Sequence, residues 1–284
     1  MLDGMMLVWF PLTAVSVMFV AVDSRSTPAS PVLKWGFRLF TVYTGPIGAF
    51  LYVLGCREPL PKSHERYVTA RWRQTLGSTI HCVAGDGIGI LAGAVLGSLI
   101  LMSTPLEVVL EYVLGFGFGW TIFQALFMKD MAGGSYGKAL RTAFLPEFLS
   151  MNWLMAAMVP VATLFRTRFP EAHHPSNPAF WFAMSMALLA GFVAAYPINW
   201  WLVSRHLKHG MLTVRPSKTD PSAAHGKASP SMSVERRPGP SEGAPRDAVA
   251  GTPVSNGSLV AMTTLSLVVL ALGLAVARYI AGRA

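Results

Sequence analysis

The chain has 284 residues, of which 52% are hydrophobic and only 13% charged, and its formal net charge is +9. Such a composition is typical of a membrane protein rather than a soluble domain. The basic residues lie in short runs between apolar segments and in a polar tail, a pattern that argues against nucleic-acid binding. Two cysteines, Cys56 and Cys82, cannot build a disulfide framework.

Seven apolar windows are long enough to cross about 30 Å of hydrocarbon as helices. They cover residues 5–22, 32–55, 75–102, 108–128, 143–165, 179–203 and 258–280. The first window lacks a positive n-region and follows Asp3, so we interpret it as a spanning helix rather than a signal peptide. The expected fold is an all-α, polytopic transmembrane bundle of about seven spans.

Lys and Arg gather in the loops after the second, fourth and sixth windows, for example at Arg71, Lys138 and Arg205. Far fewer lie opposite, and these are chiefly Arg25, Arg166, Arg168 and Arg283. The positive-inside rule therefore predicts that the even loops are cytoplasmic and that both termini lie outside. The expected location is a bacterial cytoplasmic (inner) membrane.

Four regions follow from these windows. Residues 1–74 hold two transmembrane helices and a basic interfacial segment, and residues 75–210 form a four-helix membrane core. Residues 211–257 are rich in Pro, Ser, Ala and Gly without an aromatic residue, which predicts a disordered cytoplasmic linker. Residues 258–284 form a single C-terminal anchor, and a protein partner could bind through the linker or this helix.

A stripe of small residues marks the third window. Glycines recur there with a four-residue step that His81 interrupts, so all of them share one face of the helix. The glycines are Gly77, Gly85, Gly89, Gly93 and Gly97. This face is expected to pack closely against a neighbouring helix, and "GFGFG" at residues 115–119 could supply the facing groove.

Polar side chains from several helices reach similar depths near the cytoplasmic side. At about 1.5 Å of rise per residue, His81 lies about 9 Å and Asp86 about 16 Å into the membrane. The same reckoning predicts one polar layer on the cytoplasmic side, to which four helices contribute His81, Gln124, Glu147 and Asn199. The candidate ion or ligand site consists of this layer together with Cys82, Asp86 and Asn152.

Two interpretations of Asp86 stay open. An ionised carboxylate at that depth costs about 2.5–3.5 kcal/mol on insertion scales, so it needs a partner or a proton. Arg38 in the second window is expected at a similar depth and could form a structural ion pair with it. In the other interpretation Asp86 binds a proton or a cation. Glu147 equally could be only a favourable charge near a helix start.

A metal site is a further hypothesis. His81 and Cys82 could ligate a soft transition metal together with methionines such as Met128, Met131 and Met151. Against it, most buried methionines fill gaps and most buried free cysteines are inert. The cofactor is therefore unknown, with a transition-metal ion as one possibility.

The stretches "HCVAGDGIGI", "FLPEFLSMNWLMAAM" and "FWFAMSMALLAGFVAAYPINWWLVSRHLKHGM" resemble an uncharacterised bacterial integral-membrane family, domain of unknown function 4396. The resemblance covers about residues 78–211 and implies a polytopic membrane fold without an established activity. Members often carry a second cysteine at the position where this chain has Asp86. A two-thiol metal site would need that cysteine.

Three classes of function remain at this stage. The first is a transport or permease-like protein that passes a small cation, a transition metal or a proton, through the polar layer, with His81 binding or shuttling it. The second is a non-catalytic membrane scaffold or assembly factor packed by the glycine stripe. An enzyme is the weakest, since nucleophile-elbow, HExxH and aspartate-rich phosphate motifs are missing from the sequence.

Overall fold

The computed structural model describes residues 2–57, 67–127, 129, 134–208, 210 and 254–283. Within these ranges the regular structure is helical throughout. Six helices among the described residues are long and apolar enough to cross a membrane, with α6 and the π-helix η1 counted as one. The all-α bundle expected from the sequence is confirmed.

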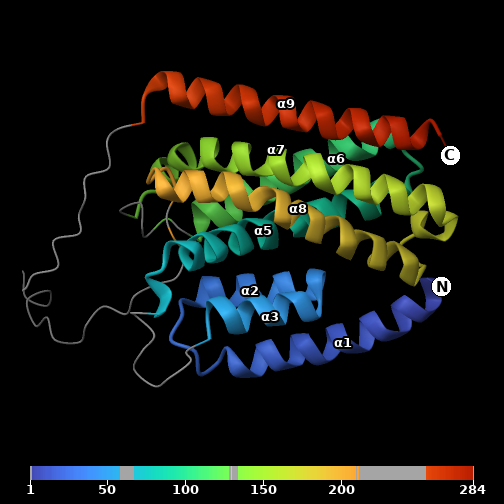
Figure 1. Cartoon of the computed structure of the whole chain (residues 1–284), viewed down its shortest axis with the longest axis horizontal. Coiled ribbons are helices and arrows are strands. Elements are labelled where there is room, and N and C mark those ends of the chain that lie inside the picture. Colours follow the sequence, from blue (N-terminus) through green and yellow to red (C-terminus); the bar gives the residue numbers. More distant parts are fainter. Residues whose placement is uncertain are drawn as a thin grey trace, which may run out of the picture.

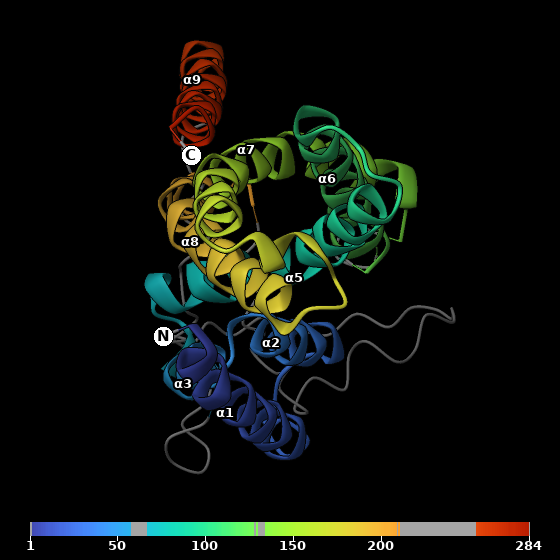
Figure 2. The ribbon, with the colours of Figure 1, turned by 90° about the vertical axis from the view of Figure 1, so that its right-hand side faces the viewer.

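The described helices follow one another in chain order. Their bounds are α1 Leu2–Asp23, α2 Pro31–Thr44, α3 Pro46–Gly55, α5 Arg71–Leu99, α6 Thr104–Phe118, η1 Gly119–Leu126, α7 Tyr136–Arg168, the 3-10 turn η3 Pro170–His173, α8 Pro178–Ser204 and α9 Asn256–Ala281. Seen from one end, α5 to α8 form a ring, with α1 to α3 on one flank and α9 outside against α7 (Figure 2). The predicted linker at 211–257 falls almost wholly outside the described residues.

The expected second span does not form. Instead of one helix over residues 32–55, the chain makes α2 and α3, which meet at Gly45 and Pro46. Gly45 has a φ of 57°, a left-handed conformation that glycine adopts easily, and Pro46 cannot continue the hydrogen-bonding of α2. A Cβ on Gly48 would lie 2.7 Å from Thr41 Cα, so only glycine allows the two helices to fold back on each other so closely.

The α2–α3 hairpin returns to the end of the bundle where it began. Tyr52 of α3 donates to Asp23 at 2.8 Å and also bonds Thr27, two residues that precede α2. Both chain ends therefore lie at the other end of the bundle (Figure 1). Both termini can lie on the same side only if the chain crosses the membrane an even number of times. Six long apolar helices with a returning hairpin give an even number, whereas the seven expected spans do not.

This topology sharpens the charge asymmetry between the two ends. Arg25, expected opposite the basic loops, lies at the same end as Arg57 and Arg73, because the α1–α2 connection is there. By the positive-inside rule that end remains the predicted cytoplasmic side. We refer to it as the basic end.

The glycine stripe of α5 packs against α6. A Cβ on Gly89 would lie 2.7 Å from Gly115 Cα, and one on Gly93 would lie 2.8 Å from Glu111 Cα. Gly85 and Gly97 face the side chains of Phe123 and Glu107 in the same way, and Gly77 is buried as well. The two backbones therefore approach as closely as the sequence pattern predicts.

The last helix, α9, packs on the outside of α7. A Cβ on Gly273 would lie 2.6 Å from Ala156 Cα, so the two helices touch backbone to backbone there. One polar contact adds to this packing, since Asn152 donates to Ser266 Oγ at 3.0 Å. Most other side chains of α9 are exposed and face the expected lipid.

Gly273→Leu should therefore release α9 from α7 while the rest of the bundle stays folded, because the added side chain overlaps the backbone of Ala156. The measurement is disulfide cross-linking between cysteines placed at Asn152 and Ser266. Gly257→Leu is the matched control, since a Cβ there meets nothing within 4 Å. Equal cross-linking in both variants would contradict the proposed packing.

Candidate functional site

Three polar residues of α5 lie deep in the bundle toward the basic end. His81, Cys82 and Asp86 are fully buried, and α5 continues past them as an uninterrupted helix. Their burial follows from the position of α5, which contacts α2, α6, η1, α7 and α8. A polar group so placed needs partners from the neighbouring helices.

Lys208 is the centre of the cluster. Its ammonium Nζ donates to Asn199 Oδ1 at 3.0 Å, to Glu147 Oε2 at 3.3 Å and to the sulfur of Cys82. The side chain is 6% exposed and that of Glu147 is fully buried, so the ion pair between them is shielded from solvent. Burial alone lowers the pKa of Lys208, but the nearby carboxylate of Glu147 outweighs it and the pKa lies above its ordinary value.

A tight turn after α8 brings Lys208 into the bundle. His206 takes the left-handed conformation with a φ of 57°, and the N–H groups of Leu207 and Lys208 both donate to Leu202 O. This is the usual way in which a helix ends and reverses its direction. Two residues on, Gly210 lies against Gln74 at the start of α5, so the chain passes close to that helix.

Cys82 joins the groups around Lys208 to η1. Its thiol donates to Glu147 Oε2 at 3.2 Å and accepts a hydrogen bond from Gln124 Nε2 at 2.9 Å. The same Gln124 nitrogen lies 3.5 Å from His81 Nδ1. Thus α5, η1, α7 and the segment after α8 each contribute a polar side chain to one network.

Asn199 of α8 completes the network on the other side. Its Oδ1 accepts from Lys208, and its Nδ2 donates to Ser150 Oγ at 2.8 Å and to Ala195 O at 2.9 Å. All hydrogen-bonding groups of its side chain are therefore used. Ser150, one helical turn after Glu147 on α7, has a role that the sequence did not indicate.

Asp86 and Glu147 form a carboxyl pair in which only Glu147 Oε2 has hydrogen-bond donors among the described residues. Asp86 Oδ1 and Oδ2 and Glu147 Oε1 are buried and have no hydrogen-bond partner within the described residues. The two carboxyl groups interact electrostatically, and both face Gly119, the first residue of η1. A Cβ on Gly119 would overlap Asp86 Oδ1 and lie 2.9 Å from Glu147 Oε1.

The π-helix η1 begins at this carboxyl pair. Short π-helical segments inside longer helices often occur at functional sites, because the extra residue per turn re-aims side chains. Here η1 places Gly119 against the carboxyl pair and Gln124 against Cys82 and His81. The expected span over 108–128 therefore corresponds to α6 and η1, and its geometry changes from α-helix to π-helix where it meets the site.

His81 lies at the edge of the network rather than at its centre. Its ring is 5.3 Å from the ring centroid of Phe123, and its Cα faces Gly36 of α2. Its Nε2 is buried without a hydrogen-bond partner in the part of the chain that the structure describes. The imidazole therefore has one nitrogen toward Gln124 and one without a partner among the described residues.

One candidate site residue, Asn152, and the expected partner of Asp86, Arg38, form their hydrogen bonds outside the network. Asn152 accepts from Tyr112 at 2.7 Å and donates to Ser266, so it links α6, α7 and α9. Arg38 donates to Ser24 Oγ at 3.1 Å and to Ala21 O at 3.3 Å at the end of α1. The expected Arg38–Asp86 ion pair does not form, because α2 begins at the basic end and keeps Arg38 there.

The residues do not fit a transition-metal centre. Among the described residues, no three His, Cys, Asp or Glu side chains are grouped so that they could hold a metal ion. Cys82 is instead surrounded by an ammonium, an amide and a carboxylate. Met151 lies against Gly115, and the other two methionines considered, Met128 and Met131, fall outside the described residues.

A second buried ion cluster lies toward the opposite end. Arg166 of α7 binds both oxygens of Glu107 at 2.8 and 2.9 Å and lies 3.8 Å from Glu111. The geometry is bidentate, and it ties α6 to α7. From the sequence, Arg166 was expected only to be one of the few basic residues on the side opposite the cytoplasmic loops.

These features define an all-helical, multi-pass membrane protein with a buried polar network in its α5–α8 core. Residues 71–208 match the family model described as a domain of unknown function (DUF4396), so this part of the chain resembles that family. The match begins at Arg71, the first residue of α5, and ends at Lys208. It therefore spans all the residues of the network around Lys208. No curated protein and no solved structure matches the chain.

Proposed function

We propose that this chain is a membrane transport protein in which Asp86 and Glu147 bind a proton next to Lys208. One observation carries the proposal: three buried carboxyl oxygens around Gly119 have no donor among the described residues. A proton held by the pair supplies the missing donor. A carboxylic acid can then donate to the neighbouring carboxylate.

Charge balance leads to the same conclusion. The network contains two carboxyl groups and one ammonium, and an unbalanced charge inside a membrane is costly. Lys208 compensates one carboxylate, and one proton compensates the other. When the proton leaves, the site carries an extra negative charge, so proton release favours a different arrangement of the surrounding helices.

The small cation is therefore a proton in this proposal rather than a transition metal. An ammonium group already occupies the position between Cys82, Glu147 and Asn199 where a metal would need open ligands. Soft-metal sites also need several thiolate, thioether or imidazole ligands around one point. The arrangement around Cys82 offers one sulfur.

His81 is assigned the relay between the carboxyl pair and the basic end. It precedes Asp86 by five residues, about 7.5 Å along α5 toward that end. Its free Nε2 and its contact to Gln124 suit a group that accepts and releases protons. The interrupted segments α2–α3 and η1 pack beside it and provide the backbone that could move during transport.

Proton flux in proteoliposomes tests the proposal. With a potassium diffusion potential as driving force, the wild-type chain should acidify the interior faster than protein-free liposomes. Glu147→Gln and Asp86→Asn should each reduce this flux at least about tenfold, because an amide cannot carry the proton. Glu171→Gln and Asp3→Asn make the same chemical changes at exposed positions and should leave the flux unchanged.

A direct readout accompanies the flux measurement. Infrared absorption of a protonated carboxylic acid should be present in the wild type and absent in Asp86→Asn or Glu147→Gln. No flux above background in the wild type would remove transport from the proposal. An infrared signal that neither variant changes would remove the proton site.

The scaffold function has one observation in its favour. Lys208 and Asn199 connect the end of α8 to α5 and α7, as a purely structural ion network would. That function predicts that both amide variants alter only stability and that no proton flux exists to be lost. The two experiments above therefore separate the alternatives.

A further inference from the structure

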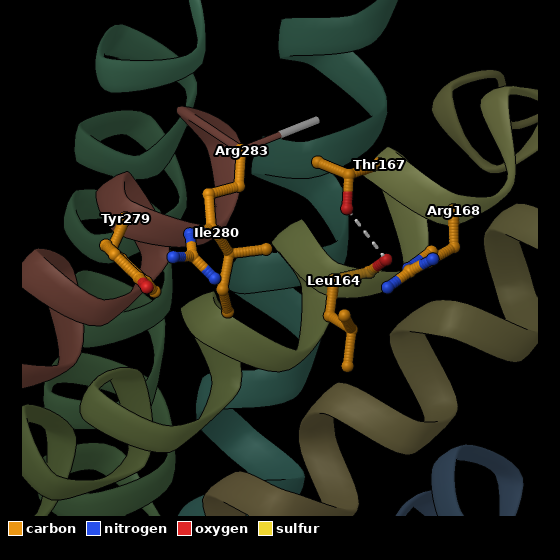
Figure 3. A pocket seen from close by; sticks show the side chains of 6 residues that line it. All are labelled: Leu164, Thr167, Arg168, Tyr279, Ile280 and Arg283. Atoms are coloured by element: carbon orange, nitrogen blue, oxygen red, sulfur yellow. Dashed lines mark hydrogen bonds between the residues drawn. The ribbon is translucent and has the colours of Figure 1, made fainter.

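A pocket lies between the ends of α7 and α9, at the end of the bundle opposite the basic end. Its volume is about 400 Å³, and it opens to the surface. Its lining comes from both helices: Leu164, Thr167 and Arg168 from α7, and Tyr279, Ile280 and Arg283 at the end of α9 (Figure 3). The proposed proton site lies elsewhere, in the α5–α8 core.

The charge of the pocket is positive. Arg168 and Arg283 line it on opposite sides, with Leu164 and Ile280 between them (Figure 3). Within the described residues neither guanidinium forms an ion pair with a carboxylate, whereas Arg166, two residues before Arg168, is fully engaged by Glu107. The two arginines therefore have donors available for an anion.

The remaining lining residues combine hydroxyl groups with an apolar floor. Thr167 donates to Leu164 O at 3.0 Å, and its oxygen can still accept a hydrogen bond. Tyr279 lies under the Arg283 guanidinium, with 4.7 Å between Cζ and the ring centroid. This contact holds Arg283 beside the pocket. Leu164 and Ile280 continue the apolar surfaces of their helices.

The position of the pocket suggests what the anion is. Both helices are long enough to span the bilayer, and the pocket lies where they end, at the level of lipid headgroups. Arginine and tyrosine are typical of that level, because the long stem or ring lies in the apolar region and the polar end reaches the headgroups. Tyr279 and Leu164 are 59% and 43% exposed, so lipid can reach both.

We propose that this pocket binds the phosphate of an anionic phospholipid. Arg168 and Arg283 hold the phosphate from two helices, and the acyl chains lie along Leu164 and Ile280. Guanidinium groups suit phosphate because they offer parallel N–H donors to its oxygens. A lipid bound in this way bridges α7 and α9 at the end where their polar contacts are few.

Native mass spectrometry of the purified full-length chain in detergent tests the proposal. Phosphatidylglycerol and phosphatidylcholine are titrated separately, and inorganic phosphate is the third probe. The wild type should bind phosphatidylglycerol preferentially. Arg168→Gln and Arg283→Gln should each weaken this binding about tenfold, as expected for losing a hydrogen bond to a charged group. Arg278→Gln, on α9 but outside the pocket, is the matched control.

Each contrary result has a defined meaning. Equal binding of the two lipids in the wild type would overturn the proposal, as would an equal loss in Arg278→Gln. Binding of inorganic phosphate alone, with the same dependence on Arg168 and Arg283, would replace the lipid by a free anion. The variant side chains are exposed, so an unchanged unfolding midpoint in lipid-free detergent confirms that each variant is folded.

Discussion

Lys208→Met is expected to destabilise the folded chain by about 3–5 kcal/mol, because it leaves a buried carboxylate without its partner. Glu147 is fully buried, and within the described residues Lys208 is its only cationic partner. The loss also frees Asn199 Oδ1 and the sulfur of Cys82 from the ammonium. The measurement is the free energy of unfolding in mixed detergent micelles.

The double variant Lys208→Met with Glu147→Gln distinguishes an ion pair from mere packing. Removing both charges should recover most of the stability, since paired removal of a buried ion pair is often nearly neutral. Lys138→Met, at an exposed position, is the control and should change stability by less than about 0.5 kcal/mol. Losses that simply add in the double variant would argue that the pair contributes nothing.

Lys208 also marks the limit of what the sequence could reveal about the site. Hydropathy places His81, Cys82, Gln124, Glu147 and Asn199 at similar depths, and the structure brings these five together. A lysine four residues beyond a membrane helix is typical of an interface. Only the left-handed turn at His206 reverses the chain and buries the ammonium, and this conformation is rare for a residue other than glycine.

Asn152 shows why depth alone is insufficient. It follows Glu147 by five residues, which rotates its side chain by about 140° around α7. It is one of the candidate site residues expected from the sequence, yet it contacts α6 and α9. Ser150 follows Glu147 by three residues, shares its face and contacts Asn199.

The hairpin illustrates a different limit. Residues 32–55 are apolar throughout, and a hydropathy window cannot distinguish one spanning helix from two short helices that return. The signals were Gly45 and Pro46 in the middle of the window, together with Gly48, which permits the close contact. By contrast, the glycine stripe could be predicted from the sequence, because a four-residue period defines one face of a helix even when the neighbouring helix is unknown.

Gly89→Ala and Gly117→Ala are expected to have opposite effects on stability. A Cβ on Gly89 would overlap the backbone of Leu114 and lie 2.7 Å from Gly115 Cα, so α5 and α6 must move apart. Overpacking of this kind costs about 3 kcal/mol where backbone is the obstacle. A Cβ on Gly117 meets nothing within 4 Å, so alanine there should stabilise α6 by about 0.5–1 kcal/mol. Unfolding free energies of the two variants provide the comparison.

The same pair of variants links the packing to the proposed function. Separation of α5 from α6 also separates Asp86 from Gly119, because both contacts lie along one helix interface. Gly89→Ala should therefore lower proton flux in the fraction of protein that remains folded, whereas Gly117→Ala should not. If Gly89→Ala lost stability but kept full flux per folded molecule, the close approach of α5 and α6 would serve the fold alone and the carboxyl pair would not depend on it.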